Sequence, residues 1–129
     1  MWKIHTYLTF GIIWIKNERI MEKYFETQMN KATHIKCELY YEKGGYGQVR
    51  GLHLSVMPVE RKRFDSNGYE FISERYIGRT GISMMIAPIS RKSDKKISEY
   101  WNKIEPLLDE VVQLFEKNDV CEICKLMKL

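Results

Sequence analysis

The chain has 129 residues, enough for one domain that buries a core without disulfides or a structural metal. Its composition, 44% hydrophobic and 29% charged, is ordinary for a globular protein and excludes a low-complexity chain. The odd count of three cysteines argues against a secreted disulfide framework, so we expect a reducing compartment and a cytoplasmic protein.

The formal net charge of +4 is unevenly distributed. Counted as Lys and Arg minus Asp and Glu, residues 1–30 carry +1, residues 31–96 carry +6 and residues 97–129 carry −3. A basic central region is suited to nucleic acid or to an acidic protein surface, and the alternative is an ordinary solvated charged surface.

Residues 1–30 differ from the remainder of the chain. The apolar run 7–15 is shorter than the roughly 20 residues that span a membrane, and no small-residue cleavage site of a secretory signal follows it, so we expect no membrane association. Three interpretations are open: an additional packed strand or helix, a partner-binding arm, or upstream sequence translated from a mis-called start. Regular patterning begins only near Lys31, which favours the third. The first residue would then be Met21 or Met29 rather than Met1.

Residues 31–63 hold the clearest pattern, two strands joined by a glycine-rich turn. Alternation places an apolar set on one face of the first strand, namely Ile35, Cys37, Leu39 and Tyr41. The turn uses residues that reach positive φ without steric cost, Gly44, Gly45 and Gly47. The second strand starts near Leu52, and we expect it to end at Pro58 because proline lacks the donor that a ladder needs.

Two further strands are predicted. Tyr69–Tyr76 is rich in aromatic and branched residues and follows the tight-turn signal Asn67-Gly68. Ile82–Ile89 is the fourth strand, and Pro88 places its end at an edge of the sheet. An exposed edge there would permit a strand-paired homodimer.

An amphipathic helix is predicted after these strands. Apolar residues recur at spacings of three or four from Ile97 to Phe115, and Ser93 is the expected N-cap. Pro106 lies inside this stretch and is expected to kink or restart the helix. The predicted fold class is therefore α+β: an antiparallel sheet of three to four strands with a long, Pro-kinked C-terminal helix packed on one face, in a single domain over residues 31–129.

No metal or cofactor site is predicted. Cys121 and Cys124 form a C-x-x-C pair, but a zinc site needs further ligands at matching spacing. His34 and Cys37, three apart on a strand, point to opposite faces and do not supply them. A redox pair belongs at a helix N-terminus, whereas this one comes late in the sequence, so the role of Cys121 and Cys124 stays open.

We also expect a non-enzymatic protein. Neither a nucleophile elbow nor a paired-carboxylate constellation occurs in the sequence. His53 with Ser55, on the outer face of the predicted sheet, is the one pair that a small enzyme would use, and this is the least favoured alternative. The Gly44–Gly47 turn joins two strands rather than opening onto a helix, which argues against a phosphate loop.

The predicted partner-binding surface is the basic outer face of the sheet together with the tip of the first hairpin. Its residues are Lys36, Tyr40, Tyr46, Arg50, His53, Arg61, Lys62, Arg63, Arg75 and Arg79. Aromatic side chains beside a basic rim suit nucleic acid, but carboxylates on the same strands would repel phosphate and an RNP-type motif is absent. These carboxylates are Glu38, Glu42, Glu70 and Glu74.

The runs 34–45 and 50–61, the Ser90–Ser93 approach to the helix and the pair Val120-Cys121 resemble small proteins of plasmids, conjugative elements and phages of gut bacteria. The resemblance covers residues 31–129 and carries over no catalytic residue. It implies a small accessory protein of a mobile genetic element in a bacterial cytoplasm.

The resulting hypothesis is a non-enzymatic interaction protein of a mobile genetic element. It would bind a bacterial protein or ribonucleoprotein complex through the basic sheet face and the hairpin tip. One version is an anti-defence inhibitor of the anti-CRISPR type, which acts by occupying a surface. The alternative is a nucleic-acid-binding accessory or regulatory protein of the element.

Overall fold

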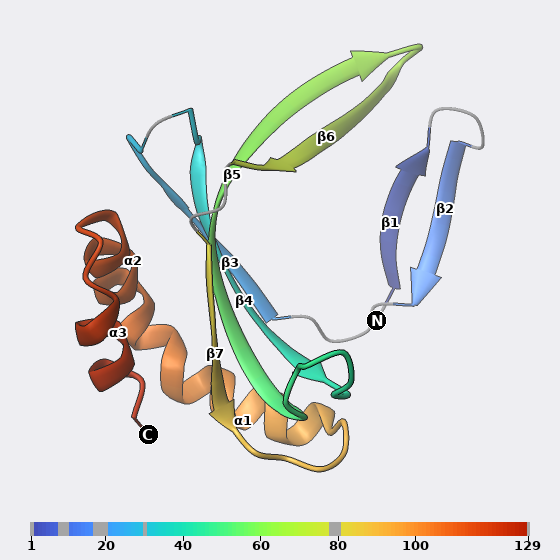
Figure 1. Ribbon diagram of the computed structural model, residues 1–129. Coiled ribbons are helices and arrows are strands. Elements are labelled where there is room, and N and C mark those ends of the chain that lie inside the picture. Colours follow the sequence, from blue (N-terminus) through green and yellow to red (C-terminus); the bar gives the residue numbers. More distant parts are fainter. Residues whose placement is uncertain (1, 8–10, 17–20, 30, 78–80, 129) are drawn as a thin grey trace.

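The described chain is α+β with an antiparallel sheet, as predicted. The computed structural model describes residues 2–7, 11–16, 21–29, 31–77 and 81–128 (Figure 1). The strands of the main sheet are β3 (Met21–Glu26), β4 (His34–Glu42), β5 (Gly51–Ser66), β6 (Tyr69–Tyr76) and β7 (Ile82–Ala87). Their order is β3-β4-β5-β6, with β7 also paired to β5. Two N-terminal strands, β1 (Trp2–Tyr7) and β2 (Gly11–Lys16), form a separate antiparallel pair.

The strand β3 lies within the segment that the sequence assigned to an N-terminal extension. It pairs with β4 over its whole length, so the main sheet begins at Met21 and has five strands rather than three or four. Met21 and Phe25 pack against the core. Lys23 lies between them on the same face, with its ammonium 5.2 Å from the centre of the Phe25 ring. Because Lys23 is charged, the alternation of apolar and polar residues along β3 is not apparent in the sequence.

The strand β5 continues through Pro58 to Ser66, so the prediction that it ends at Pro58 is wrong. In an antiparallel ladder the N–H and C=O of one residue face the same neighbour. The Pro58 carbonyl accepts from the Ile77 N–H at 3.0 Å, so the missing N–H faces the edge that β6 and β7 share. Since β6 ends at Tyr76 and β7 begins at Ile82, the proline falls between the two ladders on that edge, while on its other edge it stays paired with β4.

The predicted turns are confirmed. Gly44, Gly45 and Gly47 all have positive φ in the loop between β4 and β5. Asn67 and Gly68, with φ of 52° and 81°, form the tight turn between β5 and β6. The predicted fourth strand is β7, which pairs with β5 alone among the described strands. A strand-paired homodimer at its other edge stays a prediction.

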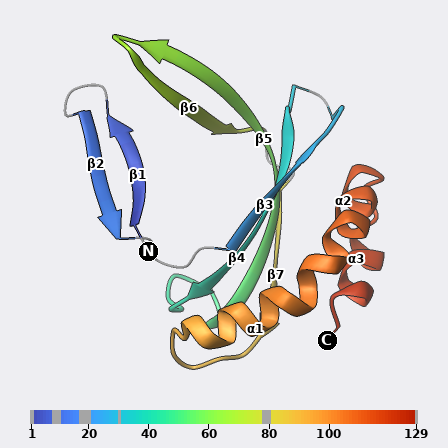
Figure 2. The same ribbon diagram turned by 180° about the vertical axis from the view of Figure 1, so that it is seen from behind.

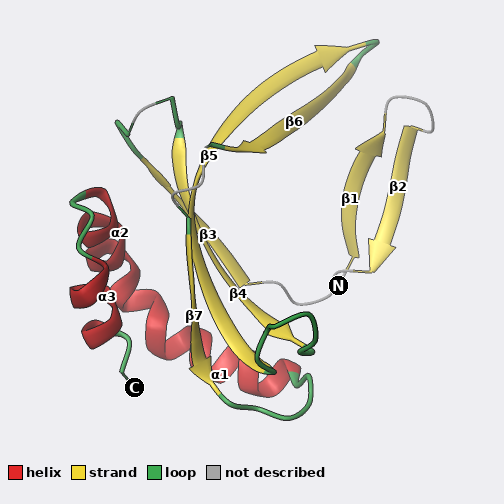
Figure 3. Ribbon diagram, viewed as in Figure 1, coloured by secondary structure: helices red, strands yellow, loops and turns green. Residues whose placement is uncertain are grey.

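The helical region is divided into several short elements (Figure 3). These are α1 (Asp94–Ile104), the 3-10 turn η1 (Glu105–Leu107), α2 (Leu108–Glu116) and α3 (Val120–Leu126). Ser93 caps α1 as predicted, its hydroxyl accepting from the Lys96 N–H at 3.3 Å. The interruption at η1 contains Pro106, which cannot donate the helical i→i−4 bond. None of the helices in the described part of the chain has the length and apolar character needed to span a membrane.

The helices lie beside the main sheet (Figure 2). One cluster of buried side chains joins the sheet and the helices. The sheet contributes alternate residues of β4 and β5, namely Ile35, Cys37, Leu39, Leu52, Leu54 and Val56. The helices contribute Ile97, Trp101, Ile104, Leu108, Val111, Val112, Phe115 and Ile123. The intervening strand residues point to the opposite side, which we call the outer face of the sheet.

Substitution of Gly51 tests how closely the start of β5 approaches the end of β7. Its φ is 154°, and a Cβ there would lie 2.7 Å from the Ala87 carbonyl oxygen. We expect Gly51→Ala to lower the free energy of unfolding by about 2–4 kcal/mol, from backbone strain plus steric overlap. Urea unfolding followed by circular dichroism measures the loss.

Gly47→Ala is the matched control. Gly47 also has positive φ, but among the described residues, its two chain neighbours aside, no heavy atom lies within 4 Å of a Cβ built there. Backbone strain alone predicts a loss of about 1–2 kcal/mol. Equal losses for the two variants would contradict the close approach of β5 and β7.

Candidate interaction surface

The distal half of β5 and the whole of β6 form a two-stranded hairpin that projects from the main sheet (Figure 1). Val59 is the last β5 residue paired with β4, whereas the pairing of β5 with β6 continues to Ser66 and Tyr69. We call residues 60–76 the β-arm. A two-stranded ribbon has no second layer of its own, so its stability and its exposed surface depend on what it contacts.

Four large apolar side chains of the β-arm are exposed. Phe64, Tyr69, Ile72 and Tyr76 have exposed fractions between 43% and 56%. Phe64 stacks on Phe71 across the hairpin, with ring centres 5.5 Å apart. Because paired residues share a face, Phe64 and Tyr69 lie on one face and Ile72 and Tyr76 on the other. Apolar surface gathered on one projecting element is typical of a binding site.

The charged side chains of the β-arm neutralise one another. Residues 60–76 hold four Lys or Arg and four Asp or Glu, which gives a formal charge of zero. Glu60 lies 3.3 Å from Arg75 and 3.4 Å from Lys62. Arg63 forms an ion pair with Glu70. Here the predicted basic face therefore consists of cations paired with carboxylates.

At the root of the β-arm, the outer face holds a group of charges around Lys36. The Lys36 Nζ lies 2.9 Å from Glu74, 3.2 Å from Glu38 and 3.5 Å from Glu22. Lys36 is only 7% exposed, which corrects its assignment to an open partner-binding surface. The register explains the burial, because Lys36 stands opposite Tyr24 on one neighbouring strand and Met57 on the other.

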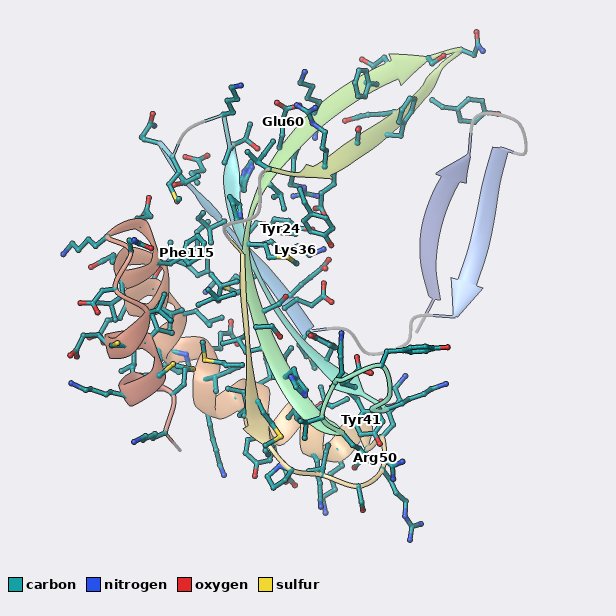
Figure 4. All side chains as sticks on the ribbon, in the orientation of Figure 1. Tyr24, Lys36, Tyr41, Arg50, Glu60 and Phe115 are labelled. Atoms are coloured by element: carbon teal, nitrogen blue, oxygen red, sulfur yellow. The ribbon has the colours of Figure 1, made fainter. Side chains whose placement is uncertain are left out.

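Tyr24 and Arg61 complete this group, which we call the Lys36 cluster. Figure 4 labels Tyr24 and Lys36, which lie side by side. The Tyr24 hydroxyl donates to Glu74. The Tyr24 ring lies 5.6 Å from the Lys36 Nζ and 3.9 Å from the Arg61 guanidinium carbon. Arg61 Nε is also 3.5 Å from Glu74. The cluster thus links β3, β4, β5 and β6 at the base of the β-arm.

Burial disfavours the charged forms of Lys36 and Glu74, but the hydrogen bonds and opposite charges within the Lys36 cluster favour these forms more strongly. Burial lowers the pKa of Lys36. The hydrogen bond to Glu74 and the nearby carboxylates together raise it by more than burial lowers it, so the pKa lies above its usual value. Burial raises the pKa of Glu74, but hydrogen bonds from Tyr24 and Lys36 bring it below its usual value. Burial and the bond to Glu74 both raise the pKa of Tyr24. At neutral pH the cluster therefore holds an ionised Lys36–Glu74 pair beside a protonated tyrosine.

A shallow groove of about 390 Å³ lies beside the Lys36 cluster on the outer face. It is lined by Glu38, Tyr40, Ser55, Met57, Gly81, Ile82 and Ser83. The Tyr40 hydroxyl lies 3.1 Å from the Ser83 hydroxyl. Ligand sites are usually enclosed and carry several convergent polar groups. This groove is open to solvent and offers one carboxylate and three hydroxyls as hydrogen-bonding groups.

The His53 side chain is held by its neighbours. Its ring stacks on Tyr40 with centres 5.8 Å apart. Its Nε2 lies 2.8 Å from the Val49 carbonyl oxygen, so this nitrogen carries the proton and donates it. Ser55 is buried. Nε2 is therefore not available as a general base toward a serine hydroxyl.

The hairpin tip lies apart from the other predicted partner-binding residues. In Figure 4 Arg50 is at one end of the sheet, whereas Lys36 is near its middle. Tyr46 is fully exposed in the loop 43–50, and the Arg50 Nε donates to the Lys43 carbonyl at 3.0 Å. The structure therefore separates the predicted surface into an arm with its root and a distant tip. Arg79 lies outside the described residues.

The cysteines are placed separately. Cys37 is buried in the core, and burial raises the pKa of its thiol to about 12. Cys121 and Cys124 are exposed on α3. Within the described ranges, no group of three or more His, Cys, Asp or Glu side chains is placed to hold a metal ion.

Sequence reasoning missed two sets of residues in this surface. Glu22 and Tyr24 were missed because β3 was not predicted, although the apolar positions Met21 and Phe25 carry its period of two. Phe64 and Ile72 were not singled out because each lies in a charged stretch. Counting outward along both strands from the Asn67-Gly68 turn predicts their cross-strand partners. This register places Phe64 opposite Phe71 and Ile72 opposite Arg63.

Comparisons with protein-family models, with curated proteins and with solved structures found no match.

The Lys36 cluster predicts a stability loss that depends on pH. We expect Lys36→Met to lower the free energy of unfolding by about 2–3 kcal/mol at about pH 7, because three carboxylates lose a shared cation and keep part of their contact with water. Because the pKa of Glu74 is lowered in the folded protein, Glu74 contributes its full stabilisation at pH values above the ordinary carboxyl pKa of 4.5. This contribution is lost as the pH falls through the lowered pKa. The difference between the two proteins should therefore shrink at about pH 4 in urea unfolding.

Lys62→Met is the matched control for this measurement. The Lys62 side chain is 61% exposed and contacts Glu60 at 3.4 Å. An exposed pair contributes less than about 1 kcal/mol. A loss for Lys36→Met that matches the control, or that stays constant between the two pH values, would contradict the assigned role of the cluster.

Proposed function

We propose that this protein is a non-enzymatic interaction protein of a mobile genetic element, which occupies the surface of a bacterial protein or ribonucleoprotein complex. The β-arm makes the central contact in this proposal. The observation that carries it is the exposure of Phe64, Tyr69, Ile72 and Tyr76 on a ribbon that projects from the sheet.

The charge of the β-arm favours a protein as the contacted molecule. A polyanion is held by an excess of cations that release its counterions, whereas residues 60–76 carry no net charge. Tyr, Phe and Arg are the residue types enriched in the centre of protein interfaces. The mixture of paired charges and exposed aromatic rings fits a protein surface with an apolar patch and a polar rim.

The helical region leaves the β-arm available in this proposal. We infer that the helices, redirected at Pro106, pack on one face of the sheet and close the core there. The shared cluster of sheet and helix side chains and the η1 turn at Pro106 support this arrangement. A partner would then meet the arm and the adjoining outer face.

The biological context comes from the sequence resemblance to small proteins of plasmids, conjugative elements and phages. In the anti-CRISPR version of the proposal, the occupied surface belongs to a CRISPR effector complex. Such an inhibitor needs contact area and shape rather than a catalytic group.

The test has two steps: a partner is first identified, and its affinity for the protein is then measured. The full chain is used as bait in a bacterial lysate, and calorimetry is then done with the purified partner. We expect Tyr69→Ser combined with Ile72→Ser to weaken binding about 30-fold or more, since interface hot spots contribute at least about 2 kcal/mol. A CRISPR effector is tested directly by adding the protein to a target-cleavage reaction, where the arm variant should fail to inhibit.

Val120→Ser is the matched control for the arm variant. Val120 is an apolar residue with 39% exposure on α3, outside the β-arm. It should bind the partner as the native chain does, and equal thermal midpoints show that all three proteins are folded. A partner that binds the arm variant with unchanged affinity would disprove the role of the β-arm. Sedimentation of the chain alone shows whether the partner is a second copy.

A further inference from the structure

Two connections and the start of α1 lie together at the end of the sheet opposite the β-arm (Figure 1). The loop 43–50 joins β4 to β5, and the segment 88–93 joins β7 to α1. Figures 1 and 2 both show this loop beside the start of α1. The Tyr41 hydroxyl, near the end of β4, donates to the Ser90 carbonyl at 3.1 Å and links that end of β4 to the segment 88–93. We call residues 42–51 and 88–97 the basic end.

The basic end carries the excess positive charge of the chain. It holds six Lys or Arg and two Asp or Glu, a formal charge of +4, which equals the net charge of all 129 residues. The six cations are exposed: Lys43, Arg50, Arg91, Lys92, Lys95 and Lys96. The rest of the molecule is therefore neutral in total, and the basic end is the region that a polyanion would approach.

These cations differ from those of the β-arm in their surroundings. Across the described ranges, no carboxylate oxygen lies within 4.0 Å of the charged nitrogens of five of them, namely Lys43, Arg50, Arg91, Lys95 and Lys96. The carboxylate of Glu42 is used inside the loop, where it accepts from the Gly44 N–H at 3.2 Å. The positive end of the α1 dipole lies in the same region and adds to the potential.

An aromatic platform stands beside these charges. Tyr46 is fully exposed, with glycines on both sides. Its φ of 49° is set by the turn in which Gly45 and Gln48 exchange two backbone hydrogen bonds of 3.2 and 2.9 Å. The ring therefore stands on a hydrogen-bonded turn and is not packed on the domain.

We propose that the basic end binds single-stranded nucleic acid, with the phosphates along the cations and a base stacked on Tyr46. Proteins that bind single strands combine a positive track with an exposed aromatic ring, because every unpaired base offers a face for stacking. A duplex keeps its bases stacked and would use the cations alone. This site is separate from the β-arm, so it does not rest on the proposed protein contact.

The salt dependence of binding tests the cations. Fluorescence anisotropy is measured with labelled oligo-dT and oligo-U of about 12 nucleotides, within the site sizes of single-strand binders. Each phosphate contact adds about −0.7 to the slope of log K against log salt, so five contacts predict about a 100-fold loss of affinity between roughly 50 and 200 mM salt. Arg91→Ala with Lys95→Ala should reduce the slope by about 1.4. Lys62→Ala with Arg63→Ala, exposed cations of the β-arm, should leave it unchanged.

The stacking contact is tested by Tyr46→Ala. We expect about tenfold weaker binding of single strands with an unchanged salt slope, and no effect on a duplex of the same length. Tyr69→Ala, an exposed tyrosine of the β-arm, is the matched control. All substituted side chains are exposed, and equal thermal midpoints establish that the variants are folded.

The proposal is overturned by any of four results. The first is that neither oligonucleotide binds at low salt, and the second is that a duplex binds as tightly as a single strand and is unaffected by Tyr46→Ala. The third is binding to phosphatidylglycerol vesicles without binding to oligonucleotides. The fourth is that the β-arm controls lose as much affinity for single strands as the variants of the basic end. Binding of either oligo-dT or oligo-U with the expected variant effects supports it, and their ratio distinguishes DNA from RNA.

Discussion

The position of Pro58 in β5 determines how the sheet is assembled. Its missing N–H points to the edge where β6 ends and β7 begins, so one strand of 16 residues pairs with two strands in succession along that edge. The first half of β5 is buried between β4 and β7, and the second half leaves the sheet with β6. The two candidate surfaces consequently lie at opposite ends of the same strand and share no residue.

Local signals in the sequence were sufficient for much of this fold. The glycine-rich loop, the Asn67-Gly68 turn, the Ser93 cap and the apolar spacing of the helical region each depend on neighbouring residues, and each was predicted. The failures depend on distant residues. Lys23 is tolerated between Met21 and Phe25 because its ammonium reaches the Phe25 ring and Glu105, and Pro58 is tolerated because of where β6 ends.

The same distinction explains the outcome at the candidate surfaces. Summed along the sequence, residues 31–96 carry +6 and suggest one basic face. The structure separates this charge into a neutral β-arm and a positive end, because cross-strand register places Glu74 opposite Arg61 and Glu60 opposite Arg75. Such pairing cannot be read from composition. The exposure of Tyr46, by contrast, follows from its flanking glycines and could be predicted.

The two-residue turn at Asn67-Gly68 has an evolutionary consequence. Side chains alternate between the two faces of a strand, so the tip of the hairpin keeps its facing only when each strand gains or loses two residues. Every such step changes the reach by roughly 7 Å, and the core residues of β4, β5 and the helices stay in place. Related chains can therefore adapt to partners of different depth by discrete changes in hairpin length, with the folding of the domain unaffected.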